Sequence, residues 1–294
     1  MLLNQKLKLY RFFKITWKID LLMIAFCISA YVLDNYVLTS VKLPVTFPAL
    51  LGTALAFFIG FNNNQAYNRW WEARIIWGAI VNDSRSWARN LLAYTNNQEL
   101  AQKMILRHLA FLYALTSALR KNSDRDYIQY LSPEEVITVE KYKNIPNAIL
   151  DLQAHDLHTL RQISATDDFS FLSLNNLLQA FCDSMGKSER INSTVFPTTY
   201  VYFTWLFIWL FIALITMATS YEAGMFSVVL GWFIGFVFHI THLNGMSLMN
   251  PFEGKPAGIP ISSITRNIEI NLLQTIQAED IPKSLEPIND EYIL

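Results

Sequence analysis

Four-residue spacing in the segment 44–61 places side chains where they could line a path for ions. Thr53, Phe57 and Phe61 share one stripe if this segment is a helix. In a ring of identical helices the stripe would give rows of Thr and Phe around an axis, and a narrow apolar constriction of that kind can gate by dewetting. The alternative interpretation is that the rings face lipid or pack on other helices, as aromatic stripes at helical spacing often do.

Small residues form the stripe next to this one. Gly52, Ala56 and Gly60 also lie four residues apart. Small residues at this spacing let helix backbones approach closely in a bilayer, where packing rather than hydrophobicity drives association. The two neighbouring stripes therefore favour a ring of copies around the Thr and Phe rows.

An amide cluster follows the apolar segment directly. Asn62, Asn63 and Asn64 come after Phe61 without a Gly or Pro break, so the helix is expected to continue beyond the membrane. Amide side chains offer both donors and acceptors, and at a pore mouth they would partly replace the hydration shell of an ion of either sign. The alternative interpretation is interfacial capping.

Two histidine pairs raise the question of a metal site. His155 and His158 flank Asp156, and His239 and His242 repeat the three-residue spacing at the end of an apolar segment. Zinc usually takes at least three protein ligands with supporting hydrogen bonds, and no third partner lies near either pair in sequence. We expect ordinary polar or interfacial histidines and no metal.

Composition excludes several classes of protein. Lys and Arg number 23 against 24 Asp and Glu, so no basic excess indicates a nucleic-acid partner. No phosphate-cradling glycine loop, nucleophile elbow or paired metal-ligand motif occurs, so neither an enzyme nor a cofactor is expected. The charged fraction of 16% lies below the roughly 25% of soluble domains, and 14% of residues are aromatic, which favours lipid contact.

Hydropathy predicts four membrane helices, because a span needs about 20 mostly apolar residues. The candidate segments are 19–41, 44–61, 199–220 and 224–242, and the last two are expected to form a helical hairpin. The first is the weakest, since Asp20 and Asp34 flank an apolar core of only 21–33, and a buried or interfacial helix is the alternative there.

The positions of the cations predict the orientation. Short loops rich in Lys and Arg stay on the cytoplasmic side, and the two hairpins between membrane segments carry only Lys42. We therefore expect a multi-pass protein of the cell (inner) membrane with both termini in the cytoplasm. The expected domains are a cytoplasmic N-terminal segment (1–18), membrane helices one and two (19–61), a cytoplasmic helical domain (62–198), membrane helices three and four (199–242) and a cytoplasmic tail (243–294).

Periodicity predicts helices in the cytoplasmic part. In 98–119 apolar residues recur mostly at three- and four-residue steps, and Ser132, Pro133 and Glu135 make a good helix start. The Pro- and Gly-containing stretch 250–261 is expected to run extended before a helix near 262–277. The predicted fold class is therefore all-α.

Two sequence blocks resemble one known family. Gly60-Phe61 is followed eight residues later by Arg69-Trp70-Trp71, then by Trp77 and Asn82-Asp83-Ser84-Arg85. Asn250-Pro251-Phe252 and the downstream stretch 266–272 form the second block. From residue 49 onward this pattern resembles the bestrophin channels.

The resemblance implies a homopentamer with one axial pore, an apolar neck and a wide cytoplasmic vestibule ending in a second constriction. Thr53, Phe57 and Phe61 match the neck positions, although Thr53 replaces the usual aliphatic residue. Animal members carry an acidic calcium clasp after Asn-Pro-Phe, where this chain has only Glu253, and one carboxylate cannot supply about six to eight oxygen ligands. No calcium gating through that clasp is expected.

The implied function is conduction of small monovalent ions. The resemblance implies chloride, while bacterial members also pass monovalent cations such as sodium, and an apolar neck imposes no sign. The expected partners are other copies of the chain, the lipid bilayer and the permeating ions. A membrane-anchored scaffold and a secondary transporter are the alternatives; a transporter would normally show internal repeats and a charged residue at mid-membrane.

Overall fold

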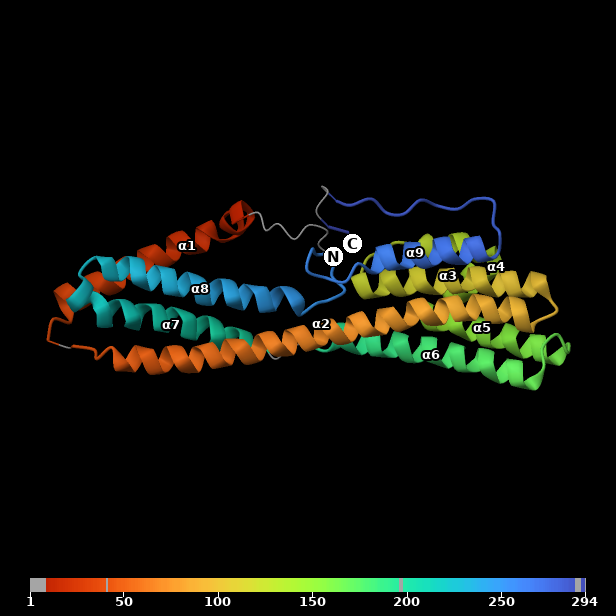
Figure 1. Cartoon of the computed structure of the whole chain (residues 1–294), viewed down its shortest axis with the longest axis horizontal. Helices are drawn as coiled ribbons and strands as arrows, with labels where there is room; N and C mark the ends of the chain where they lie inside the picture. Colours follow the sequence, from red (N-terminus) through yellow and green to blue (C-terminus); the bar gives the residue numbers. More distant parts are fainter. Residues whose placement is uncertain (1–8, 41, 196–197, 289–291, 294) are drawn as a thin grey trace. The chain divides into compact units, whose positions relative to one another are not determined.

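The computed structural model describes residues 9–40, 42–195, 198–288 and 292–293. These form helices joined by turns and loops, with an irregular stretch over 278–287 and an isolated bridge between Ile288 and Tyr292. The chain divides into two compact units (Figure 1). The membrane unit comprises the described residues of Asn4–Arg69 and Val195–Met249. The polar unit comprises those of Trp70–Thr194 and Asn250–Leu294. The all-α prediction is confirmed.

The membrane unit contains the helices that hydropathy predicts. They are α1 (Leu9–Val32) with a short π-helix η1 (Leu33–Val37), the first part of α2 (Thr46–Tyr94), α7 (Thr198–Ala223) and α8 (Phe226–Leu248). Thr16–Val37, Thr46–Tyr94, Thr198–Ala223 and Phe226–Leu248 contain stretches apolar enough to cross a bilayer. The α7–α8 hairpin and the continuation of the second helix past Phe61 are both confirmed, whereas α1 begins earlier than the predicted segment.

Close packing in the membrane unit depends on small residues of α8. A Cβ added to Gly235 would meet Ile212 Cγ1 of α7 at 2.6 Å, and one on Gly231 would meet Thr216 of α7 and lie 3.3 Å from Cys27 Sγ of α1. Such contacts bring helix backbones together in a bilayer. We predicted close approach from the glycines of the second segment, and missed the spacing of Gly231 and Gly235 in the fourth.

The polar unit is a helical bundle built around α3 (Gln98–Arg120). Around it lie the rest of α2, η2 (Asp126–Tyr130), α4 (Pro133–Val139), α5 (Ile145–Gln162), α6 (Asp168–Ser193) and α9 (Ile261–Thr275). The predicted apolar face of α3 is buried, with Leu100 partly exposed at its start. Ser132 and Glu135 form the predicted capping box at the start of α4.

The stretch 250–261 folds back instead of running extended, so that prediction is wrong. The Ile259 N–H donates to the Pro251 carbonyl at 2.7 Å, and the Gly258 N–H donates to the Lys255 carbonyl at 2.9 Å. A Cβ on Gly258 would lie 2.6 Å from the Glu253 carbonyl oxygen. The prolines fix φ and the glycine permits this close approach, so the residues close a compact turn.

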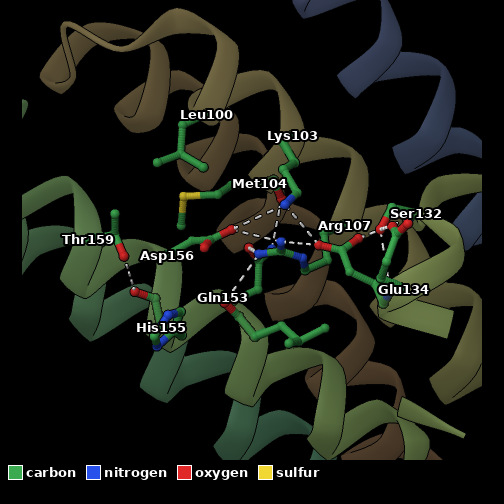
Figure 2. A network of polar contacts seen from close by, with 12 residues as sticks. Leu100, Lys103, Met104, Arg107, Ser132, Glu134, Gln153, His155, Asp156 and Thr159 are labelled. Atoms are coloured by element: carbon green, nitrogen blue, oxygen red, sulfur yellow. Dashed lines mark hydrogen bonds and ion pairs between the residues drawn. The ribbon is translucent and has the colours of Figure 1, made fainter. Parts of the chain in front are cut away.

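A buried ion-pair network joins α3, α4 and α5 (Figure 2). Arg107 is 2% exposed; it pairs with Glu135 and lies 2.7 Å from Asp156 Oδ2, while Lys103 lies 3.1 Å from Glu135. Gln153 donates to the Met104 carbonyl at 2.7 Å. Burial raises the pKa of Glu135, but the Ser132 N–H and the Arg107 guanidinium outweigh burial and hold that pKa below its usual value. Two cations balance two carboxylates here.

A second buried polar contact lies between α2 and α3. His108 is fully buried among aromatic rings, and its Nε2 lies 2.8 Å from Ser84 Oγ. Burial lowers the pKa of His108 to about 3, so the ring stays neutral at physiological pH.

Candidate pore-lining site

The candidate neck residues occupy one exposed face of α2. Phe57 is 78% exposed and Phe61 is 47% exposed in the single chain, and Thr53 is exposed between them and the helix start. The Thr53 hydroxyl donates to the Ala49 carbonyl at 3.0 Å, so its hydrogen bond is made within its own helix. The stripe therefore faces lipid or another copy of the chain, and does not pack within its own unit.

The opposite face of α2 is buried in the membrane unit. Leu55 is 1% exposed, Ile59 is 2% exposed and Asn62 is 2% exposed, and Ala66 is completely buried. These residues alternate three- and four-residue steps, which keeps them on one side of the helix. The buried side of α2 therefore packs within its own subunit, and the side with the aromatic stripe stays exposed.

The predicted small-residue stripe is divided between the two faces. Gly52 is buried, and a Cβ there would lie 2.8 Å from the Phe211 ring of α7, whereas Ala56 and Gly60 are exposed. Each four-residue step turns the position by about 40° around the helix, and Gly52 lies at the edge of the buried face, against Phe211. Gly52 thus packs within the subunit, and only Ala56 and Gly60 remain available to a neighbouring copy.

The three amides beyond the stripe have different surroundings. Asn62 is buried and donates to Thr204 Oγ1 of α7 at 3.1 Å, and Asn63 donates to the Thr241 carbonyl of α8 at 3.0 Å. Only Asn64 is exposed, on the side of the helix that carries Phe57 and Phe61. Asn62 and Asn63 therefore tie α2 to its neighbours, and Asn64 alone keeps a free amide surface at the end of the stripe.

The two motif blocks meet within the polar unit. Trp70 Nε1 donates to the Ala257 carbonyl at 3.0 Å in the turn that follows Asn250-Pro251-Phe252. Pro251 is buried and Phe252 is 1% exposed in the core, while Asn250 donates to Glu253 at 3.3 Å. These residues hold the start of the C-terminal stretch against α2, which is a structural role.

Other residues of the motif join the same helices. Arg85 donates to Asn271 Oδ1 of α9 from Nε at 3.1 Å and from Nη2 at 3.0 Å. Arg69 is half-buried, and Trp71 is 49% exposed with its ring 6.3 Å from that of Trp70. Arg69 and Trp71 thus lie at the point where α2 passes from one unit to the other.

The exposed charges of α2 in the polar unit are positive. Arg74, Arg85 and Arg89 are exposed, whereas Asp83 is partly buried and Glu72 is paired with Arg190 at 2.5 Å. Beyond the amides, this helix therefore presents positive charge to solvent.

The histidine pairs lie in different surroundings. His155 and His158 are exposed on α5, and His239 and His242 are buried on α8. Among the residues that the structure describes, no three His, Cys, Asp or Glu side chains gather in a way that could hold a metal ion.

One exposed aromatic was missed in the sequence. Phe169, in the first turn of α6, is 86% exposed, more than any other large apolar side chain of the described residues. Its only sequence signal is an aromatic directly after the Asp167 N-cap and Asp168. A single exposed aromatic is common on a protein surface, so the exposure of Phe169 does not by itself define a site.

The fold and the exposed stripe define a multi-pass helical membrane protein, and comparison with known proteins identifies its family. The family model described as Bacterial/Fungal Bestrophin protein matches residues 13–274. The chain belongs to this family.

Individual relatives agree with the family assignment. The voltage-dependent anion channel-forming protein YneE of Salmonella typhi is 28% identical over 253 residues, which cover 86% of this chain and 83% of that protein. The protein of the same name from Escherichia coli K12 is 27% identical over 258 residues, covering 87% and 85%. A crystal structure of a bacterial bestrophin homologue from Klebsiella pneumoniae has a TM-score of 0.82 and 25% identity, covering 89% of this chain and 98% of that chain.

Proposed function

We propose that the chain forms a homopentameric ion channel whose neck is lined by Thr53, Phe57 and Phe61. The observation that carries this proposal is the one-sided burial of α2. Its inner face is buried in the membrane unit, and its outer face presents an aromatic that is 78% exposed. In a ring of copies, that face closes a narrow apolar passage, and Ala56 and Gly60 beside it allow neighbouring helices to approach.

In this proposal the protein lies in the cell (inner) membrane with both termini and the polar unit in the cytoplasm. The Lys and Arg distribution supports this orientation. The polar unit surrounds a vestibule that ends in a second constriction.

We further propose that anions permeate more readily than cations. The curated relatives carry names that describe anion channels. The exposed charges of α2 beyond the amides, on Arg74, Arg85 and Arg89, are positive, and a cavity lined by one sign of charge concentrates the opposite ion. Cation conduction is the other outcome of the test, because the apolar neck itself has no sign.

Reversal potentials of the purified protein in planar bilayers under asymmetric KCl test this proposal. We expect a current that reverses near the chloride equilibrium potential. Arg85→Gln with Arg89→Gln should move the reversal potential toward zero without abolishing the current. A reversal near the potassium potential would contradict anion preference, and absence of current from a confirmed pentamer, beside active control channels, would contradict the channel itself.

A further inference from the structure

In the polar unit, an amide of α9 holds one cation of α2. Arg85 donates to Asn271 Oδ1 from Nε at 3.1 Å and from Nη2 at 3.0 Å. Both guanidinium atoms are donors, so the Asn271 atom that faces them must be the amide oxygen. One acceptor therefore takes two N–H groups along one edge of the guanidinium. The Nη1 amino group and the second Nη2 hydrogen form no bond with a described residue and stay available to another partner.

The helix that carries this amide is itself anchored. On α9, Glu269 is 2% exposed, and it accepts hydrogen bonds from the Tyr113 hydroxyl of α3 at 2.6 Å and from the Tyr130 hydroxyl of η2. Residues two apart on a helix point to different sides, so Glu269 anchors α9 on α3 while Asn271 is directed to α2. Asn271 is partly buried, which limits the directions that its amide can take.

The acceptor for Arg85 is neutral, whereas four other arginines of the polar unit each pair with a carboxylate. These four are Arg107, Arg125, Arg161 and Arg190. Asp83 lies two residues before Arg85 and therefore on another side of α2, and Glu269 faces α3. No carboxylate of the described residues forms an ion pair with Arg85. An amide acceptor thus holds the guanidinium in place and leaves its positive charge uncancelled.

We propose that Asn271 positions Arg85 for contact with permeating anions, so that the anion preference of the channel depends on the amide at position 271. A charged donor that is already held in place attracts an anion without the cost of ordering a flexible side chain. Arg89, one turn further along α2, is exposed and bonds no described residue, so it adds charge without a fixed direction. The role in permeation rests on the proposed anion channel, whereas the contact between the two side chains does not.

Thermal unfolding of the purified full-length protein tests the contact without any current. Asn271→Asp places a carboxylate oxygen where the amide oxygen accepts from Arg85, so we expect the new ion pair to raise the unfolding midpoint by about one to three degrees. The same substitution in Arg85→Gln should give no rise. Asn267→Asp, at an exposed position one turn earlier on α9, should change the midpoint equally in both backgrounds. Equal changes for Asn271→Asp in the two backgrounds would refute the contact.

Reversal potentials in planar bilayers under asymmetric KCl test the role in permeation. Asn271→Asp cancels the charge of Arg85, so it should move the reversal potential toward zero as far as Arg85→Gln does. Asn267→Asp adds the same charge away from the contact and should move it less.

Asn271→Ala separates positioning from charge, because it removes the acceptor and leaves the net charge unchanged. We expect it to lower anion preference in the wild type and in Arg89→Gln, but to cause no further loss in Arg85→Gln. A wild-type reversal potential in Asn271→Ala, or an equal shift with and without the Arg85 guanidinium, would overturn the positioning role. Absence of current from a confirmed pentamer, beside active control channels, would refute the channel and this role together, while the unfolding midpoints would still decide the contact.

Discussion

Replacing Phe57 by Ala should raise the single-channel current severalfold and lengthen the open time. Phe57 presents more exposed aromatic surface to the proposed axis than Thr53 or Phe61, and in a pentamer five rings are removed together. A wider and less apolar constriction holds water more readily, so the barrier for a passing ion falls. A tenfold increase in current corresponds to a decrease of about 1.4 kcal/mol in this barrier. Planar-bilayer recordings of the two purified proteins measure the change.

Phe233→Ala is the matched control for this substitution. Phe233 is 56% exposed on α8, so it is comparable to Phe57 in size and in exposure within the single chain. Its removal should leave the current and the oligomeric mass unchanged. Equal effects of the two substitutions, or an unchanged current in Phe57→Ala, would place the Phe57 ring outside the passage.

Replacing Arg107 by Met should lower the free energy of unfolding by about 3–5 kcal/mol, the cost of leaving buried charges without their partner. Glu135 and Asp156 both pair with this guanidinium, which is 2% exposed (Figure 2). Denaturant titration of the full-length protein, followed by far-ultraviolet circular dichroism, measures the loss.

Two variants show whether the loss comes from the unpaired carboxylates. Lys103 contacts the same carboxylates but is 49% exposed, so Lys103→Ala should cost no more than about 1 kcal/mol. Adding Glu135→Gln and Asp156→Asn to Arg107→Met should restore much of the stability, because no buried charge then remains. If Arg107→Met has the same free energy of unfolding as the wild type, the ion-pair network contributes nothing to stability.

Local patterns in the sequence predicted the elements well. The spans of α7 and α8, the buried face of α3 and the capping box at Ser132 each depend on residues close together in the chain. The continuity of α2 past Phe61 followed from the absence of a helix-breaking residue. These features depend on propensity and periodicity, which a single sequence contains.

Features that depend on distant partners could not be predicted in the same way. The burial of Gly52 is decided by the Phe211 ring, and the burial of Asn62 by Thr204. The compact turn at 250–260 depends on a hydrogen bond between Ile259 and Pro251 that the prolines alone do not indicate. In each case the contact comes from tertiary packing, which periodicity does not describe.

Two buried polar residues of the membrane unit show the same limit. Asp20 looked like a flanking residue of a weak segment, and His239 like one of an ordinary pair. Only the packing of α1 and α8 in the membrane unit buries both side chains and leaves Asp20 Oδ1 and the two ring nitrogens of His239 without a hydrogen-bond partner among the described residues. A charged residue next to an apolar core is a weak signal of burial, because most residues of this kind lie at the interface.

A cysteine at position 57 tests most directly whether the exposed stripe of α2 lines the pore. In Phe57→Cys with Cys182→Ser, which removes the exposed native thiol, a charged and membrane-impermeant thiol reagent should block the bilayer current. Phe233→Cys in the same background should give no block. Labelling of the introduced thiol at position 57 only by a lipid-soluble reagent, with an unchanged current, would show that the stripe faces lipid and would contradict the pore.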